Sequence, residues 1–249
     1  MTISDSVLSQ VKFLFRALAD FAFPPVCYGC DEEIETGLVC DSCRLFLFTS
    51  ELDVCCRCGR PCLPDAGVCG RCDLPLSLSR VRAVGVYQPP FQGLIHALKY
   101  SEKTALVPIL GSALALLLEQ DSQLKRAHGI CAVPLHPARL RERGYNQAYL
   151  LAKEVSSITE VSLFDPLVRK RNTESQTMMK DDSERIENVR DAFRVKPGVK
   201  LGGERLILVD DVMTTGATIS AAGAELLNAG AEEVMGLVLA AAICPKDKG

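Results

Sequence analysis

Ten of the 12 cysteines in this chain of 249 residues lie between Cys27 and Cys72, while Cys131 and Cys244 stand alone. Such crowding forces part of the chain to fold around cross-links or metal. The first residues do not read as a secretory signal, because charged side chains interrupt the apolar run. We therefore expect these cysteines to bind metal rather than to form disulfides.

Eight of these cysteines form four C-x2-C pairs. The pairs are Cys27 with Cys30, Cys40 with Cys43, Cys55 with Cys58, and Cys69 with Cys72. Each pair directs two thiolates at one ion, and two pairs complete a tetrahedron without an open position for a catalytic water. The spacing predicts two structural Zn²⁺ ions in a double zinc ribbon over residues 26–76.

Residues within and beside these pairs carry further expectations. We expect Gly29 and Gly59 to supply the permissive backbone angles of a tight knuckle. Cys56 and Cys62 are surplus, and the spacing leaves other pairings open among the cysteines from 55 to 62. Cys56 is interpreted as a filler residue rather than a redox group. A segment so poor in aliphatic residues needs metal in order to fold.

Residues 1–25 have apolar side chains at helical spacing, which predicts an amphipathic helix. Packing on the rest of the protein is the favoured interpretation, and a membrane-surface anchor is the alternative. No run of apolar residues is long enough to span a bilayer, so the chain is predicted to be cytoplasmic. The formal net charge of −3 requires any contact with nucleic acid to come from a local patch.

Residues 77–249 have a different character, since apolar runs alternate with helical patterns. Strands are expected at 81–87, 130–134, 205–210 and 234–240, and helices at 91–100, 105–118, 146–156 and 218–228. This alternation predicts an α/β fold with a doubly wound, mostly parallel sheet. In such sheets ligands bind at the carboxyl ends of the strands.

The segment LILVDDVMTTGAT, residues 206–218, places two carboxylates and a small polar loop at one such strand end. Its candidate ligand-binding residues are Asp210, Asp211, Thr214, Thr215, Gly216, Ala217 and Thr218. Loop amides at a helix N-terminus suit a phosphate, and carboxylates accept hydrogen bonds from ribose hydroxyls. Both carboxylates are expected at the solvent-facing strand end. The alternative is a helix cap followed by ordinary turn residues.

The segment AVPLHPARLRERGYNQA, which follows the strand at 130–134, carries three arginines in five residues. Their planar guanidinium groups suit phosphate oxygens, although a solvated helix face is an equal alternative. His136 is expected to be a structural hydrogen-bond partner rather than a general base.

The order of the motifs along the chain resembles that of the ComF family of competence-associated proteins. The motifs are the paired ribbons, VRAVGVY, IHALKY, PLHPARLRERGYNQA and VDDVMTTGAT. The resemblance extends from Phe23 to Ala240. It implies a bacterial cytoplasmic protein linked to natural transformation or DNA uptake, with a type I phosphoribosyltransferase domain. Residues 206–218 resemble the family's binding signature for phosphoribosyl pyrophosphate (PRPP). The resemblance also implies that the loop with Leu135, His136 and Arg139 contacts the pyrophosphate.

The resemblance also implies a reaction and leaves alternatives. A phosphoribosyltransferase would displace pyrophosphate from PRPP with Mg²⁺, and a mobile loop over residues 169–190 would close on the ligand. An ordinary solvated loop over these residues is an equal alternative. Arg143, Arg169 and Arg185 are candidate catalytic residues. The alternatives are a nucleotide-sensing adaptor, whose ribbons dock DNA-processing partners, and direct binding of single-stranded DNA, for which the ribbons offer few aromatic side chains.

Overall fold

The computed structural model describes residues 24–49, 54–62, 77–170 and 191–242. Nearly all of the expected N-terminal helix lies outside these ranges, as do Cys69, Cys72, Arg185 and nearly all of the predicted loop at 169–190.

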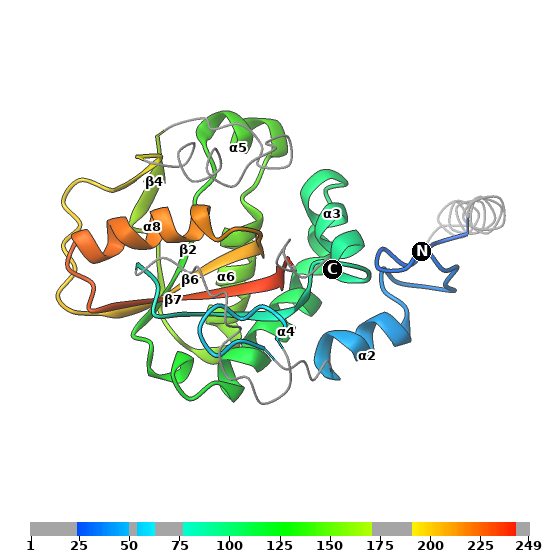
Figure 1. Cartoon of the computed structure of the whole chain (residues 1–249). Helices are drawn as coiled ribbons and strands as arrows, with labels where there is room; N and C mark the ends of the chain where they lie inside the picture. Colours follow the sequence, from blue (N-terminus) through cyan, green and yellow to red (C-terminus); the bar gives the residue numbers. More distant parts are fainter. Residues whose placement is uncertain (1–23, 50–53, 63–76, 171–190, 243–249) are drawn as a thin grey trace, which may run out of the picture.

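A parallel five-stranded sheet forms the centre of the C-terminal domain, with the order β1-β7-β6-β2-β3 (Figure 1). Its strands are β1 (Arg80–Val86), β2 (Gly129–Ala132), β3 (Leu163–Phe164), β6 (Arg205–Met213) and β7 (Glu233–Ala241). The central strands β2, β6 and β7 are apolar on both faces, as burial between two layers requires. The predicted α/β fold is confirmed.

Helices cover both faces of this sheet. The helices of this domain are α3 (Phe91–Tyr100), α4 (Val107–Gln120), α5 (Pro137–Arg143), α6 (Gln147–Thr159) and α8 (Ala217–Asn228), with short 3-10 turns at Thr104–Leu106 and Leu124–Arg126. Helix α5 has no buried residues and does not belong to either layer. One core joins α3, α4 and α6 to alternate residues of β6, such as Ile207 and Val209. The other joins α8 and the antiparallel pair β4 (Leu167–Arg169) and β5 (Phe193–Val195) to Leu206 and Leu208.

The two knuckles of the N-terminal region share one backbone pattern. In the first knuckle, the N–H of Cys27 donates to the carbonyl of Glu32 at 2.8 Å, and Asp31 occupies φ 62°. In the second, the N–H of Cys55 donates to the carbonyl of Arg60 at 2.8 Å, and Gly59 occupies φ 67°. The left-handed residue therefore follows the second cysteine of each pair.

The prediction for Gly59 is confirmed, but the prediction for Gly29 is wrong. Gly29 has no left-handed φ; a Cβ there would lie 2.8 Å from the Cβ of Pro90 and 3.0 Å from the Sγ of Cys43. Gly29 is thus explained by close packing against the segment before α3, rather than by its backbone angle.

Both knuckles pack directly on the C-terminal domain. A Cβ at Gly93 of α3 would lie 2.3 Å from the carbonyl oxygen of Tyr28, so α3 touches the first knuckle. Helix α2 (Asp41–Thr49) adds Leu47 to the core of α3 and α4. The second knuckle lies against the edge strand β1, where the N–H of Val81 donates to the carbonyl of Arg57 at 2.6 Å.

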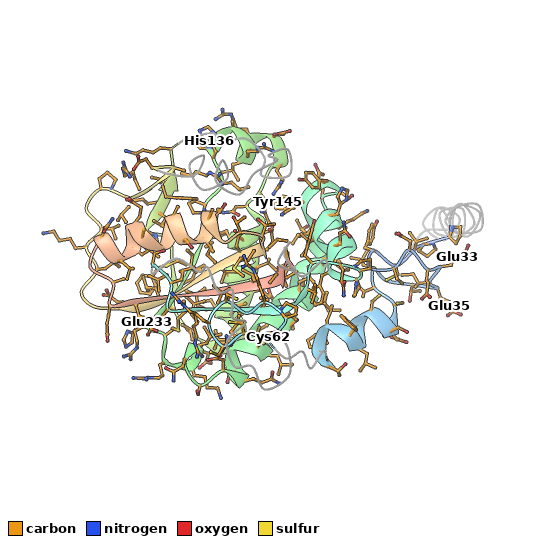
Figure 2. The ribbon with its side chains drawn as sticks, viewed as in Figure 1. Glu33, Glu35, Cys62, His136, Tyr145 and Glu233 are labelled. Carbon is orange, nitrogen blue, oxygen red and sulfur yellow. The ribbon has the colours of Figure 1, made fainter. Side chains whose placement is uncertain are left out.

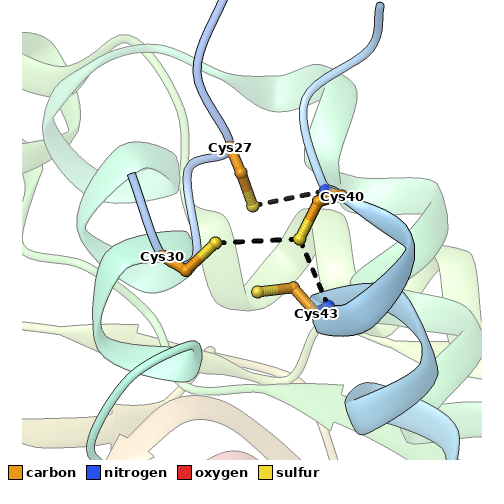
Figure 3. Close-up of side chains that lie close together, drawn as sticks. All are labelled: Cys27, Cys30, Cys40 and Cys43. Atoms are coloured by element: carbon orange, nitrogen blue, oxygen red, sulfur yellow. Dashed lines mark hydrogen bonds between the residues drawn. The ribbon is translucent and has the colours of Figure 1, made fainter. Parts of the chain in front are cut away.

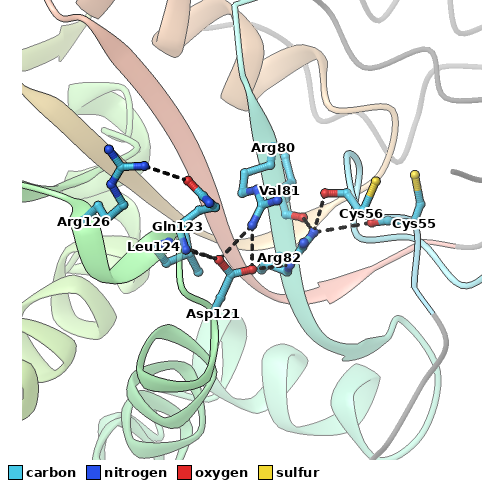
Figure 4. Close-up of polar contacts among 9 residues, drawn as sticks. All are labelled: Cys55, Cys56, Arg80, Val81, Arg82, Asp121, Gln123, Leu124 and Arg126. Atoms are coloured by element: carbon cyan, nitrogen blue, oxygen red, sulfur yellow. Dashed lines mark hydrogen bonds and ion pairs between the residues drawn. The ribbon is translucent and has the colours of Figure 1, made fainter. Parts of the chain in front are cut away.

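Charged side chains of β1 join the second knuckle to the end of α4 (Figure 4). Arg82 donates through Nη1 to the carbonyl of Cys56 at 2.9 Å and through Nε to Asp121 at 2.7 Å. Arg80 also pairs with Asp121, at 2.8 Å. Burial raises the pKa of Asp121, but the N–H groups of the following turn and the two arginines have the larger combined effect and lower it below its ordinary value. The carboxylate therefore remains ionised.

Candidate ribose-phosphate site and zinc centre

The two adjacent carboxylates belong to β6 itself, which continues to Met213 rather than ending at Asp210. Successive side chains of a strand point to opposite faces of the sheet. Asp211 shares its face with Ile207 and Val209, on the side of α3, whereas Asp210 shares its face with Leu206 and Leu208, on the side of α8. The motif therefore supplies one carboxylate to each side of the strand.

Asp211 is 2% exposed, so the expectation that both carboxylates face solvent is wrong for this residue. Its Oδ1 lies 2.8 Å from Nζ of Lys99 on α3, while its Oδ2 is buried without a hydrogen-bond partner in the described part of the chain. Burial lowers the pKa of Lys99, but Asp211 and, less strongly, Asp210 raise it above the ordinary value. This pair anchors α3 to the strand that carries the motif.

Asp210 is half-buried, and its N-terminal neighbour Val209 is fully buried. Burial and the adjacent carboxylate of Asp211 raise the pKa of Asp210 from 3.8 to about 7, against the opposing effects of Lys99, of the N–H of Asp211 and of Arg169. A raised pKa means that the ionised form of Asp210 is unfavourable in the free protein. A ligand that supplies hydrogen bonds or positive charge would stabilise this ionised form.

The loop after β6 ends in a left-handed glycine that starts α8. Gly216 has φ 86°, and its carbonyl accepts the N–H of Ser220 at 2.9 Å. Thr215 Oγ1 accepts the N–H of Ala217 at 3.3 Å. Thr214, Thr215 and Thr218 are partly exposed, whereas Gly216 and Ala217 are buried. A loop of small residues at a helix N-terminus is the arrangement that binds phosphate groups.

The arginines of the second motif lie on α5, beside a cavity of about 190 Å³. Arg139 and Arg143 line it from one side and Lys99 and Tyr100 from the other; two carboxylates, Glu102 and Glu142, complete the lining. Arg143 lies over the ring of Tyr100, at 5.4 Å from the centroid, and donates to the side-chain oxygen of Gln147. The exposed Arg141 does not line this cavity.

His136 and Tyr145 bracket α5 (Figure 2). His136 Nδ1 accepts the N–H of Ala138 at 3.2 Å and caps the helix, which is the structural hydrogen bond expected of it. Tyr145 donates its hydroxyl to the carbonyl of Leu98 on α3. Leu135 is partly exposed between β2 and α5, on the loop predicted to meet pyrophosphate.

Four cysteines of the first ribbon converge on one point (Figure 3). The Sγ atoms of Cys27, Cys30, Cys40 and Cys43 all lie within 4.8 Å of one another, and those of Cys30 and Cys40 are 3.7 Å apart. Zn–S bonds of about 2.3 Å place tetrahedral sulfurs roughly 3.8 Å apart, so the cluster has the dimensions of a zinc site.

The backbone around Cys27 favours its thiolate, whereas burial and the neighbouring cysteine thiols raise the pKa of Cys43. The N–H groups of Gly29 and Cys40 both lie 3.3 Å from Sγ of Cys27. Burial raises the pKa of the Cys27 thiol, but these N–H groups, together with the N–H and the thiol of Cys30, lower the pKa to about 7. Ligation by zinc requires such deprotonation.

In the second ribbon the structure describes only the first half of the expected ligand set. Cys55 and Cys58 are buried in the core with α8, and the N–H of Cys58 donates to Sγ of Cys55 at 3.5 Å. Cys56 is exposed and Cys62 is partly exposed. Cys55 and Cys58 are thus buried close to each other, and their pairing as zinc ligands stays a prediction.

Two family models match the chain. Residues 18–73 match the double zinc ribbon domain, and residues 144–248 match the phosphoribosyl transferase domain. The chain is 31% identical over 218 residues to the DNA utilization protein YhgH of Escherichia coli strain K12, which covers 85% of this chain and 94% of that protein.

Two further relatives carry names from competence. The competence protein F of Haemophilus influenzae is 28% identical over 215 residues, covering 84% of this chain and 87% of that protein. The competence protein ComFC of Bacillus subtilis is 29% identical over 199 residues, covering 77% of this chain and 79% of that protein.

Together these matches and the fold define a protein with a double zinc ribbon and a phosphoribosyltransferase domain of the type I kind. Within that class, the chain belongs to the ComF/YhgH family, as its motifs predicted. Across the described ranges, none of the helices combines the length and the apolar character that crossing a bilayer requires.

Lys99 is a site residue that the sequence did not single out. It is part of the tract IHALKY, but a lysine after an apolar helical run is usually a solvated end. Its proximity to Asp211, across more than 100 residues of chain, comes from the packing of α3 on β6. The available signal was that Lys99 comes one turn after Ile95, an apolar residue that the structure buries.

Proposed function

We propose that this protein binds PRPP at the carboxyl end of β6 and transfers its phosphoribosyl group to an acceptor with release of pyrophosphate. The observation that carries the proposal is the convergence of three groups: the half-buried carboxylate of Asp210, the Gly216 loop at the start of α8, and the arginine-lined cavity beside Lys99. The match of residues 144–248 to the phosphoribosyl transferase domain supports it.

Each part of PRPP then has a complementary group. Asp210 and, behind it, Asp211 serve the ribose hydroxyls, and the amides and hydroxyls of residues 214–218 hold the 5-phosphate. Leu135, His136 and Arg139, on and after the loop from β2, face the pyrophosphate together with Arg143. Mg²⁺ would bind with the diphosphate, where it neutralises charge on the leaving group.

Catalysis on this proposal is mainly electrostatic. Arg143, Arg169 and Arg185 are the candidates for stabilising the negative charge that develops on the departing pyrophosphate. Burial lowers the pKa of Arg169, and the charges of Asp210 and Arg139 both act on it, which supports its place among these candidates.

The direct test is to incubate purified protein with Mg-PRPP and to measure pyrophosphate release with and without candidate nucleobases. Base-dependent release supports transfer. Tight binding of PRPP without release in any mixture would refute the enzyme and favour a non-catalytic sensor with the same site. Absence of both binding and release would refute the site as well.

We further propose a role in DNA uptake or utilization, because the relatives that cover most of this chain are named for competence and for DNA utilization. On this view the ribbons dock DNA-processing proteins or single-stranded DNA. Co-purification of a DNA-processing partner, lost on disruption of the first ribbon, would support docking; gel-shift assays would detect binding of single strands.

We expect two zinc ions per purified chain, one on the first four cysteines and one on Cys55, Cys58, Cys69 and Cys72. Cys40→Ser should lose about one equivalent and loosen the N-terminal region, because structural zinc contributes folding energy. Inductively coupled plasma analysis gives the count. Cys56→Ser is the matched control and should keep both ions; loss of zinc from this variant would reassign the second ligand set.

Arg143→Ala should weaken PRPP binding more than ribose 5-phosphate binding, because only PRPP carries the pyrophosphate that Arg143 is proposed to meet. Loss of a charged hydrogen bond costs about 1.5–3 kcal/mol. Calorimetric titration with both ligands measures the difference. Arg141→Ala removes an exposed arginine of the same helix and should change neither affinity. Equal weakening of both ligands by Arg143→Ala would remove Arg143 from the pyrophosphate site.

A further inference from the structure

One side chain of the second ribbon reaches into the proposed phosphate loop. Arg60 follows the knuckle of Cys55 and Cys58 directly, yet its side chain points into the C-terminal domain and the residue is only 6% exposed. Its Nη2 donates to the carbonyl oxygen of Thr214 at 2.8 Å. The contact joins residues 154 positions apart.

The backbone that carries Arg60 is fixed at both ends of the knuckle. The carbonyl of Arg60 accepts the N–H of Cys55 at 2.8 Å, and the N–H of Gly59 donates to the carbonyl of Cys55 at 2.9 Å. A Cβ at Gly59 would lie 2.7 Å from the carbonyl oxygen of Val81, so the knuckle is pressed against β1. The guanidinium group therefore projects from a rigid base.

The hydrogen bond fixes the orientation of one peptide group in the loop. In a trans peptide the C=O and N–H groups point in opposite directions. Because Arg60 holds the carbonyl of Thr214, the N–H of Thr215 is directed away from the ribbon. A buried cation beside this loop also makes its surroundings more favourable for an anion.

We propose that Arg60 is a positioning residue, through which the second ribbon orders residues 214–216 to receive the 5-phosphate of the ligand. This inference rests on the proposed function of that loop. The cysteine knuckle and the sugar-phosphate site are then coupled. An intact knuckle raises the affinity of the loop for phosphate, and bound phosphate raises the affinity of the knuckle for zinc.

The test compares two ligands, ribose 5-phosphate and Mg-pyrophosphate, by calorimetric titration. Arg60→Met keeps the length of the side chain but removes the donor, and should weaken ribose 5-phosphate roughly ten-fold. Affinity for Mg-pyrophosphate, which contacts the other side of the site, should remain unchanged. Arg60→Lys restores a donor and should recover most of the affinity. Arg44→Met removes an exposed arginine from α2 and serves as the control.

A second measurement begins with the parent protein. In the parent protein, saturating ribose 5-phosphate should slow the transfer of zinc from the second ribbon to a colorimetric chelator, and should leave release from the first ribbon unchanged. Arg60→Met should abolish this protection. Cys40→Ser, which disrupts only the first ribbon, leaves the second release phase to be followed alone.

The outcomes separate the two proposals. If the parent binds ribose 5-phosphate and Arg60→Met binds it equally well, with unchanged zinc release, the positioning role is wrong while the proposed function stands. If Arg60→Met weakens both ligands alike, Arg60 supports the fold in general and the inference is overturned. If the parent binds neither ligand, the proposed function fails, and the inference fails with it.

Discussion

Asp210→Asn is expected to weaken binding of Mg-PRPP at pH 8 by roughly ten- to one-hundred-fold, because it removes a charged acceptor worth about 1.5–3 kcal/mol. The substitution keeps the size of the side chain and its place at the end of β6. It should not destabilise the protein. Burial and the neighbouring Asp211 raise the pKa of Asp210 to about 7, so at pH 8 the folded protein bears the cost of an ionised group in an unfavourable place.

The raised pKa of Asp210 determines how its contribution to stability changes with pH. The folded protein holds the proton of Asp210 up to about pH 7, whereas an unfolded chain releases it near 3.8. Between these values the native state binds more protons, so the contribution of Asp210 to stability falls as pH rises. Asp210→Asn should therefore melt at a higher temperature than the parent at pH 8, and at nearly the same temperature at pH 4.

Calorimetric titrations and melting curves at several pH values test both parts. The affinity of the parent for PRPP should fall as pH is lowered through 7, by more than the affinity of Asp210→Asn, whose remaining change reports the titration of the ligand phosphates. Glu119→Gln removes an exposed carboxylate at the end of α4 and is the matched control. If folded Asp210→Asn bound PRPP as tightly as the parent, the ribose site would lie elsewhere.

The pair of Lys99 and Asp211 predicts the second large effect, on stability rather than on binding. Their side chains are 22% and 4% exposed, and removing one partner leaves the other charge in the interior. Lys99→Met should lower the free energy of unfolding by about 3 kcal/mol, the lower end of the range for breaking a buried pair. Asp211→Asn should do the same, because Lys99 then loses the largest favourable influence on its charged form.

A double-mutant cycle measured by urea unfolding isolates the interaction. The double variant Lys99→Met, Asp211→Asn should recover much of the lost stability, since neither charge remains unpaired. The exposed pair of Lys125 and Glu119 gives the control cycle, with an expected coupling of less than about 1 kcal/mol. Additive losses in the Lys99 cycle would show that the two residues stabilise the fold independently.

The sequence predicted those parts of the molecule that rest on local patterns. Buried strands such as β6 and β7 are read from uninterrupted apolar runs, and the cysteine pairs from fixed ligand spacing. The segment 206–218 begins with an apolar run and continues with a fixed order of carboxylates and small polar residues. Its place at the carboxyl end of a buried strand could therefore be predicted.

The unpredicted features depend on contacts between distant segments. Lys99 reaches Asp211 only because α3 packs beside β6, and Arg60 reaches Thr214 only because the second knuckle lies on β1. The same holds for position 29, where Pro90 and Cys43 leave no room for a side chain. The backbone angles of the turn itself do not require glycine there. The different burial of Asp210 and Asp211 follows from strand alternation, once β6 is known to continue beyond them.

The position of the second knuckle also affects how this protein behaves in the company of its own copies. An open edge strand exposes unpaired N–H and C=O groups on which another chain can build a sheet. At the start of β1 these groups face the knuckle, where Val81 bonds to Arg57 and Gly59 leaves no space against the strand. The opposite edge is β3, which has only two residues, Leu163 and Phe164, and offers a short template. The second knuckle thus covers the start of this edge, and a chain without the knuckle would expose the longer of the two edges.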